Sequence, residues 1–269
     1  MATDYLRDVL LTARMQARLC QAVYAGKQGV REMAAKTNCR FRWFEVGNNC
    51  AGALIFQDHI HLSICGSNDR YDWMQNADTH ADKKGNFVAH RGFLRAATQL
   101  RDVIVDSDLP QYINGWPSRP LVIGGHSAGG AIAQLMALDA KLNPREIITF
   151  GAPKALAISS AAAYAVGPWE VHRFVMDGDI IPFMPLRIGA AILNRPRYAH
   201  TCSPVYLHED GTIDADDTTI LQLAWARMKQ FTCLGFASLL AFTGIYRSVW
   251  KKHGIARYVA AIEKGVANA

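Results

Sequence analysis

Hydrophobic and polar positions along the first part of the chain predict one helix followed by an antiparallel hairpin of strands. Residues 4–24 place their apolar side chains at close to helical spacing, and Gly26 ends or interrupts that helix. Between Cys39 and Cys65 the pattern changes to short runs that are typical of strands. The expected strands cover residues 40–45, 51–56 and 59–65.

The rest of the chain alternates buried strands with helices. A helix is expected from His90 onward, and residues 110–120 are expected to form a loop that leads into the next strand. Further strands are predicted at 121–123, 146–150 and 170–176, with helices at 131–140 and near 154–164. This order favours an α/β fold with a mainly parallel central sheet flanked by helices. No repeat, low-complexity tract or linker is evident, so we expect residues 1–269 to form a single domain.

Composition narrows the class of protein without giving a function. Of the 269 residues, 50% are hydrophobic and 19% are charged, which fits a globular chain with a sizeable core. The net charge is +6, but the basic residues are scattered and form no nucleic-acid-binding motif, so we expect no nucleic-acid partner. The N-terminal residues lack the apolar stretch of a signal peptide, which makes the cytoplasm the default location. If a leader peptide has been removed from this sequence, the expected location is instead outside the cell.

The six cysteines do not follow the spacing of a metal site, and no C-x-x-C pair occurs among them. Most are therefore expected to be small buried side chains. Cys39 and Cys50 are the candidate pair for a disulfide across a loop.

A nucleophile elbow is the motif with the clearest chemistry. Residues 121–123 form a β-branched run, the pentapeptide Gly125-His-Ser-Ala-Gly129 follows, and an alanine-rich run comes next. This strand–turn–helix order is what a G-x-S-x-G elbow requires, because the tight turn holds the serine hydroxyl clear of the sheet. Ser127 is therefore a candidate nucleophile, and the N–H of Ala128 would face negative charge that develops beside it. Without partner residues, the same pattern fits a glycine-rich turn whose serine caps a helix.

The residues after the elbow supply candidate partners for a serine nucleophile. A serine needs a histidine to take its proton and a carboxylate to orient that histidine, and in hydrolase sheets the acid comes first in the chain. Asp177 and Asp179 both follow the expected strand 170–176; we favour Asp179, because the buried segment after it can fix its position. Either aspartate also fits a role as a turn cap that takes no part in catalysis. Composition alone leaves three histidines open as the base: His200, His208 and His253.

A set of short motifs in a fixed order is more specific than the elbow alone. The set comprises Cys65-Gly-Ser67 with Asp72-Trp73, His90-Arg-Gly-Phe93, Gly125-His-Ser-Ala-Gly129, Thr149-Phe-Gly-Ala-Pro153, Asp179-Ile-Ile-Pro182 with Pro185, Tyr198-Ala-His200 and His253-Gly-Ile-Ala-Arg-Tyr258. In these motifs the chain resembles the class 3 lipases, the fungal triacylglycerol lipase type, over about residues 40–260. One departure is Cys65, which stands where the family usually has arginine.

The resemblance implies an α/β-hydrolase fold and a Ser-His-Asp triad. It places the nucleophile at Ser127, the acid at Asp179 and the base at His253. This order agrees with the order that the chemistry requires. His200 matches a family histidine with a structural role, followed by a strand such as 205–207.

The resemblance also implies an oxyanion hole and a lid. The hole would use the backbone N–H and hydroxyl of Ser67 together with the N–H of Ala128. Residues 68–86 correspond to a lid-like segment, although its apolar face is small. Residues 230–246, within an apolar and helical segment at about 220–250, fit a buried helix, a cover of the site that meets a lipid surface, or a membrane span. The expected substrate contacts are Tyr71, Trp73 and His126.

The expected function is therefore a serine carboxylic-ester hydrolase, a lipase or esterase that works through an acyl-enzyme. Its substrate would be an acylglycerol or related lipid ester, with transient contact to a lipid interface and without a metal or organic cofactor. Two alternatives remain at this stage. One is an esterase for non-lipid esters, such as feruloyl or short-chain esters. The other is a catalytically silent lipase-like scaffold that binds a ligand or partner protein.

Overall fold

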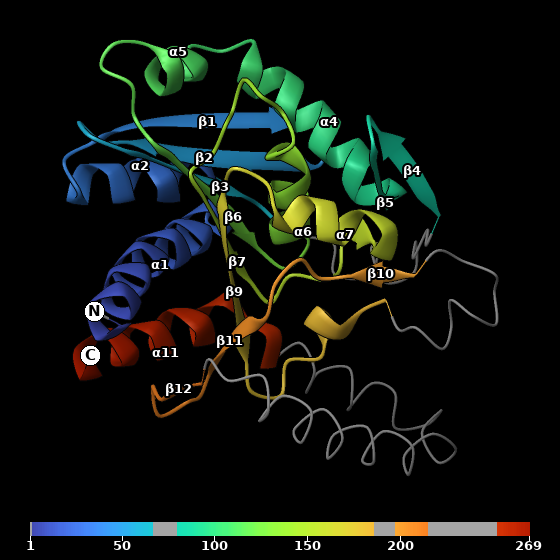
Figure 1. Cartoon of the computed structure of the whole chain (residues 1–269). Helices are drawn as coiled ribbons and strands as arrows, with labels where there is room; N and C mark the ends of the chain where they lie inside the picture. The colour runs from blue at the N-terminus through green and yellow to red at the C-terminus, as the bar shows by residue number, and fades with distance from the viewer. Residues whose placement is uncertain (1, 67–79, 186–196, 215–251) are drawn as a thin grey trace.

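The centre of the fold is an eight-stranded mixed sheet (Figure 1). The computed structural model describes residues 2–66, 80–185, 197–214 and 252–269. Across the sheet the strands follow the order β1 (Arg40–Val46), β2 (Asn49–Ile55), β3 (Ile60–Ile64), β6 (Leu121–His126), β7 (Glu146–Phe150), β9 (Glu170–Met176), β11 (Pro204–Leu207) and β12 (Ile213–Asp214). Neighbours from β1 to β3 are antiparallel, those from β3 to β11 are parallel, and β12 is antiparallel to β11. The predicted α/β fold with a mainly parallel central sheet is confirmed.

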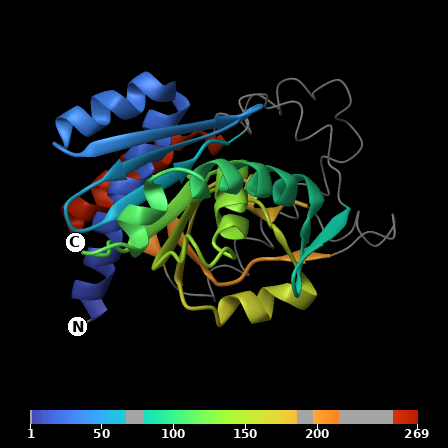
Figure 2. The same ribbon diagram turned by 90° about the horizontal axis from the view of Figure 1, so that it is seen from above.

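Helices cover both faces of this sheet, because successive side chains of a strand point to opposite sides. In β7, Ile147 packs into the core on one face and Ile148 into the core on the other. The face of Ile148 is covered by α1 (Ala2–Tyr24), α2 (Gly26–Lys36) and α11 (Ile255–Asn268). The opposite face is covered by α4 (Arg91–Val105), α5 (Leu109–Asn114), α6 (Ala128–Met136) and α7 (Ile158–Ala165) (Figure 2).

A second, four-stranded sheet lies beside the helices of the latter face. Its strands follow the order β10 (Tyr198–Ala199), β8 (Leu156–Ala157), β5 (Phe87–His90) and β4 (Ala81–Lys84). All described neighbours in it are antiparallel. Residues 81–84 belong to the expected lid-like segment, so this end of that segment forms an ordinary strand pair with β5.

Two short elements depart from the expected pattern for clear physical reasons. Gly26 adopts a φ of +77°, a left-handed conformation that ends α1 and lets a second helix, α2, begin at once. Residues 110–120 were expected to be a loop, but α5 occupies Leu109–Asn114. Pro110 is tolerated there because the first turn of a helix does not need its N–H.

The two ends of the chain come together on one side of the sheet. Helices α1 and α11 pack against each other, and the N- and C-termini lie close together in Figure 1. The guanidinium of Arg18 on α1 donates to the carboxylate of Glu263 on α11 at 2.7 Å. Helices α1 and α11 share one core cluster with strands of the central sheet.

The structure does not pair Cys39 with Cys50, the candidate disulfide that the sequence left open. Both are free thiols, and the register of the β1–β2 hairpin separates them. Arg40 pairs with Ile55, so Cys39 lies near the opposite end of β2 from Cys50, on the order of 20 Å away at strand spacing. A disulfide requires Cα atoms within about 7 Å.

Some expected features lie outside the described residues. These are Ser67, Tyr71, Trp73, most of the lid-like segment and residues 230–246. Among the helices that are described, none combines the length and the apolar character needed to cross a membrane.

Candidate active site

The elbow after β6 has the geometry that its sequence predicts. Ser127 has φ +58° and ψ −133°, a conformation that costs energy for any residue with a side chain. The turn is held by two backbone hydrogen bonds, from the Ser127 N–H to the Phe150 carbonyl at 2.9 Å and from the Gly130 N–H to the Ser127 carbonyl at 3.0 Å. Helix α6 begins at the next residue, Ala128.

The glycines of the elbow are required by close backbone contacts. A Cβ atom at Gly125 would lie 2.5 Å from the carbonyl carbon of Gly129. A Cβ at Gly129 would lie 2.2 Å from the carbonyl oxygen of Ile64, at the end of β3. The elbow therefore fits directly against the end of β3, where Gly66 follows two residues later.

Asp179 and His253 form a buried acid–base pair. The His253 Nδ1 lies 2.7 Å from the Asp179 Oδ2, and both side chains are almost completely buried. The Nδ1–H donates to the carboxylate, which leaves Nε2 as the basic nitrogen of the ring. The Ile181 N–H, which follows in the short 3-10 helix η1 (Ile181–Phe183), donates to the other oxygen of Asp179 at 3.0 Å.

Tyr258 on α11 completes the shell around the acid. Its hydroxyl donates to the Asp179 Oδ2 at 2.6 Å and accepts the Met176 N–H at 3.1 Å. Burial, together with the Asp179 charge, raises the pKa of Tyr258 well above its usual value, so the phenol remains a donor. The aromatic ring lies edge-on to His126 and Phe150, which places it at the junction of the elbow and the acid.

Gly151, directly after β7, leaves the space that the pair needs. It has φ +60°, and a Cβ there would lie 2.7 Å from the Asp179 Oδ2 and 2.9 Å from the His253 Cε1. The same Cβ would be 2.8 Å from the Tyr258 hydroxyl. Gly151 and Tyr258 both lie within motifs of the resemblance, but the sequence gave neither of them a role in the site.

The structure distinguishes the three histidines that composition left open. His253 meets Asp179. The Nε2–H of His200 donates to the Pro182 carbonyl at 2.6 Å, and burial lowers the pKa of His200 well below its usual value. His200 therefore supports the segment after the acid, as the resemblance implied.

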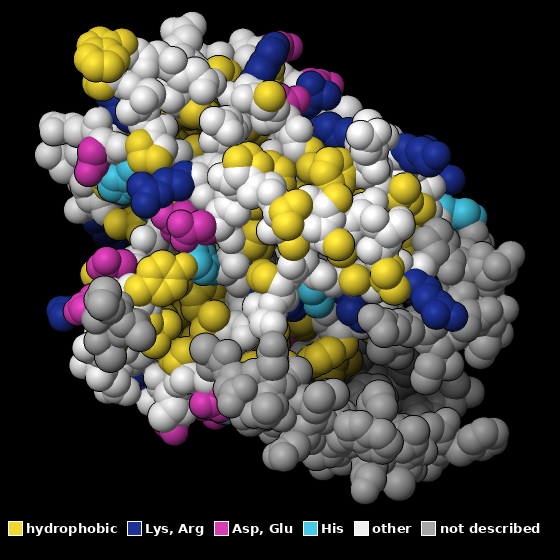
Figure 3. Space-filling view, viewed as in Figure 1, with side chains coloured by type: hydrophobic (Ala, Val, Ile, Leu, Met, Phe, Trp, Pro, Cys, Tyr) yellow, Lys and Arg dark blue, Asp and Glu magenta, His cyan; other side chains and the backbone are white. Residues whose placement is uncertain are grey.

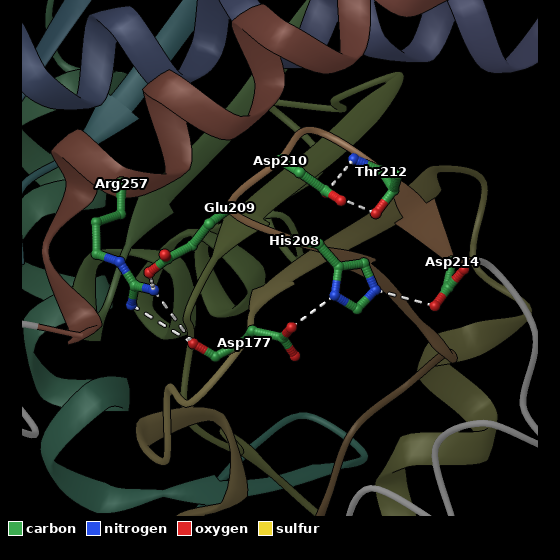
Figure 4. A network of polar contacts seen from close by, with 7 residues as sticks. All are labelled: Asp177, His208, Glu209, Asp210, Thr212, Asp214 and Arg257. Atoms are coloured by element: carbon green, nitrogen blue, oxygen red, sulfur yellow. Dashed lines mark hydrogen bonds and ion pairs between the residues drawn. The ribbon is translucent and has the colours of Figure 1, made fainter.

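His208 belongs to a separate polar network beside the acid turn (Figure 4). Its two ring nitrogens contact the carboxylates of Asp177 at 2.5 Å and Asp214 at 2.9 Å. Burial acts to lower the pKa of His208, but the two carboxylates outweigh it and the pKa is raised. Arg257 donates to the Asp177 carbonyl at 3.4 Å and to the Glu209 carboxylate (Figure 4). Asp177 thus belongs to the support of the turn, while Asp179 carries the histidine.

His126 connects the elbow to the base and to the N-terminal helix. Its Nε2 donates to the backbone carbonyl of His253 at 2.6 Å, and its Nδ1 accepts the Tyr24 hydroxyl at 2.9 Å. The His126 and His253 rings lie 4.5 Å apart between centroids. Both ring nitrogens are engaged by protein groups, so the ring holds the elbow, the base and α1 together, while the expected substrate contact of His126 stays a prediction. Tyr24 is a site residue that the sequence gave no reason to select.

One of the two expected oxyanion donors is described. Ala128 is the first residue of α6, so its N–H lies at the positively polarised end of that helix, next to Ser127. Gly66 precedes the other expected donor, Ser67, which is outside the described residues. A Cβ at Gly66 would lie 3.4 Å from the Ser127 Cβ, so the chain enters position 67 close to the elbow.

On the face drawn in Figure 3, the described Lys and Arg side chains, in dark blue, lie in several places among white and yellow groups and do not form one continuous basic patch. This view agrees with the scattered basic residues of the sequence.

Comparison with known families identifies the class of protein. Residues 61–188 match the family described as Lipase (class 3). The matched region contains Ser127 and Asp179, whereas His253 lies beyond it. The assignment of His253 therefore depends on its contact with Asp179. No curated protein matches the chain.

Solved structures with a similar fold are fungal lipases. The native lipase–propeptide complex of Rhizomucor miehei is 19% identical with a TM-score of 0.58, over 80% of this chain and 73% of that chain. Lipase II from Rhizopus niveus is 17% identical with a TM-score of 0.58, over 81% of this chain and 86% of that one. A triacylglycerol lipase described as having a serine protease triad at its catalytic centre is 20% identical with a TM-score of 0.54, over 77% and 79%. At these identities the likeness establishes the fold.

Proposed function

We propose that the protein is a serine hydrolase of carboxylic esters, with an acylglycerol or related lipid ester as substrate. The observation that carries this proposal is the buried Asp179–His253 pair, joined through His126 to a strained elbow serine. The match of residues 61–188 to the class 3 lipase family supports lipid esters in general as the substrate class. The described triad of a triacylglycerol lipase with the same fold supports the same chemistry.

In the proposed mechanism the Ser127 hydroxyl attacks the acyl carbonyl while the Nε2 of His253 takes its proton. Asp179 stabilises the imidazolium that forms and keeps its Nδ1–H in place. The oxyanion is held by the N–H of Ala128 and by the N–H and hydroxyl of Ser67. His253 then gives its proton to the leaving alcohol. Water, activated by the same histidine, releases the acid from Ser127.

The test uses a fluorophosphonate serine probe and a series of p-nitrophenyl esters from short to long acyl chains. Ser127→Ala is expected to lose probe labelling, and both Ser127→Ala and His253→Ala should lose on the order of 10⁴-fold or more in kcat/KM. Ser118→Ala and His59→Ala, which change residues at the opposite ends of β6 and β3, serve as matched controls and should keep the wild-type rates.

The outcomes separate the proposal from its alternatives. A preference for long acyl chains supports a lipase, and a preference for short chains supports an esterase of non-lipid esters. A folded wild type that neither labels nor turns over any ester would favour the silent scaffold. Labelling that survives Ser127→Ala would remove this serine as the nucleophile.

A further inference from the structure

Cys50 of β2 faces Cys65, the residue directly after β3, at the end of the antiparallel β2–β3 pairing. Ala51 pairs with Ile64, so the next positions along the ladder are Cys50 and Cys65. The Cys65 N–H donates to the Cys50 carbonyl at 2.9 Å, which marks a hydrogen-bonded pair. The Cα atoms of such a pair are about 5.5 Å apart. This spacing lies within the range of native disulfides.

The two thiols meet on the face of the sheet that α1 and α2 cover. Both side chains pack with Leu19 and Val23 of α1, and they lie within hydrogen-bonding reach of each other. Cys65 is buried, whereas Cys50 is only partly buried. The contact with Cys65 lowers the pKa of Cys50, and the contact together with burial raises the pKa of Cys65. The more accessible thiol is therefore the one that ionises first.

We propose that Cys50 and Cys65 form a redox-active dithiol site that reacts with low-molecular-weight disulfides such as oxidised glutathione. The Cys50 thiolate attacks one sulfur of the small disulfide, which forms a mixed disulfide and releases one thiolate. Cys65 then loses its proton and attacks the Cys50 sulfur, which closes the protein disulfide and releases the second thiolate. The two protons of the cysteines end on the two released thiols. The protein is oxidised by two electrons, and the small disulfide is reduced by two.

The dithiol lies directly beside the candidate active site. Cys65 precedes Gly66, at which a Cβ would meet the Tyr24 hydroxyl at 2.3 Å and the His126 carbonyl at 2.9 Å. A Cβ at Gly129 of the elbow helix would lie 2.8 Å from the Cys65 carbonyl carbon. A bond at Cys65 therefore acts on backbone that touches both the elbow and the Tyr24–His126 contact. Closure replaces a van der Waals contact between sulfurs by a bond of about 2.0 Å, which draws the end of β3 toward β2.

Cys39 provides a matched control within the same part of the molecule. It is also partly buried and packs against the same core cluster, but its sulfur contacts the Thr37 hydroxyl at 3.3 Å. It lies near the far end of the β1–β2 hairpin from Cys50. Cys39→Ser therefore changes one thiol of similar exposure and leaves the dithiol intact.

The test treats the reduced full-length protein with oxidised glutathione and maps the products by mass spectrometry under non-reducing conditions. Wild type and Cys39→Ser should lose two hydrogen atoms and give one linked peptide pair, Cys50 with Cys65. Cys65→Ser should stop at a glutathione adduct on Cys50, and Cys50→Ser should form neither product. The oxidised wild type should melt at a temperature higher by about 5 °C, because the closed loop restricts the unfolded chain. A wild type that stays reduced while folded, or that links other cysteines, would overturn the proposal.

A second readout tests the link to the active site, and this part alone depends on the proposed function. Oxidised wild type should label with the serine probe several-fold more slowly than reduced wild type, and a reducing thiol should restore the rate. Cys50→Ser should label at one rate under both conditions. Equal rates in the two forms of wild type would show that the disulfide forms without reaching Ser127. If the proposed function fails, no form labels, and the mass measurement still decides the dithiol.

Discussion

The contacts around Gly151 give the acid–base pair little freedom, because the Asp179 Oδ2, the Tyr258 hydroxyl and the His253 Cε1 all lie within 3 Å of where a Cβ would be. We therefore expect Gly151→Ala to displace the pair and to lower the rate of serine-probe labelling by on the order of 10²-fold. Probe labelling and kcat/KM measure this effect.

Gly47 is the control for the backbone part of this change. It has a similar φ of +56°, but a Cβ there meets nothing within 4 Å. Gly47→Ala should cost about 1 kcal/mol of unfolding free energy, as expected for a left-handed position, and leave the labelling rate unchanged. If the two variants label equally fast, the packing around Gly151 does not position the pair.

The Tyr24 hydroxyl allows a test of the positioning role of His126. Tyr24→Phe removes the hydroxyl that the His126 Nδ1 accepts, while Nε2 keeps its bond to the His253 carbonyl. The ring loses one of two anchors, so we expect kcat to fall about tenfold with little change in KM, and stability to fall by about 1 kcal/mol. Tyr5→Phe on the same helix, whose exposed hydroxyl contacts Glu170 at 3.4 Å, should change neither. An unchanged kcat in Tyr24→Phe would limit His126 to a structural role.

The sequence selected the candidate site residues that a local motif defines, and it did not select those that only a tertiary contact brings to the same place. Ser127 follows from the elbow, and Asp179 follows from its place after a strand. Tyr24 joins the site only because α1 approaches it across the fold. Gly151 lies in a motif of the resemblance, but its role depends on contacts with residues that are far apart from it in the chain, so the sequence gave it none.

Among the elements, the turn after β9 is connected to the edge strand β12 through His208, the residue directly after β11. The pKa of His208 is raised in the folded protein by Asp214 and Asp177. The stabilisation that His208 gives is therefore fully present below its unfolded pKa of about 6.5. It is lost as the pH rises through the higher pKa of His208 in the folded protein. We expect wild type to be stabilised relative to His208→Gln at pH 6, with the difference shrinking toward pH 9. Urea unfolding at several pH values measures it.

A surface histidine provides the comparison for this effect. His59 stacks on Phe56 and contacts the exposed Asp58 in the β2–β3 turn, away from the acid turn. His59→Gln should leave most of the pH dependence of wild type in place. If His208→Gln keeps the same pH dependence as wild type, the two carboxylates do not bind the imidazolium in solution.

At the scale of elements, the strands were predicted better than the short helices. Strands β7 and β9 have the predicted bounds, because β-branched and aromatic runs that are buried on both faces give a clear signal. Helix α5 was missed because Pro110 and Pro120 favoured a loop, and β4 was missed because Ala81–Lys84 is almost entirely polar. It pairs with β5 across the two-residue turn Gly85-Asn86, in a stretch that was expected to belong to the polar lid-like segment.

At the scale of the whole molecule, the N-terminal helix and the C-terminal helix support the site from one face of the sheet. Ala13 and Ala17 of α1 share one core cluster with Phe174 and with Tyr258, the donor to Asp179. Because small side chains at these positions let α1 approach closely, the packing of the first helix bears on the position of α11.

We therefore predict that a substitution in the core of α1 shifts α11 and, through it, the position of Asp179. Ala17→Leu adds volume to a side chain that is fully buried, so we expect a loss of about 1–3 kcal/mol in urea unfolding and slower probe labelling of the native protein. Arg18→Ala removes an exposed ion pair with Glu263 and should cost less than about 1 kcal/mol, with the labelling rate unchanged. The two variants compare a substitution at a buried position of α1 with one at the exposed position next to it. A loss of stability in Ala17→Leu without slower labelling would confine α1 to stabilising the fold.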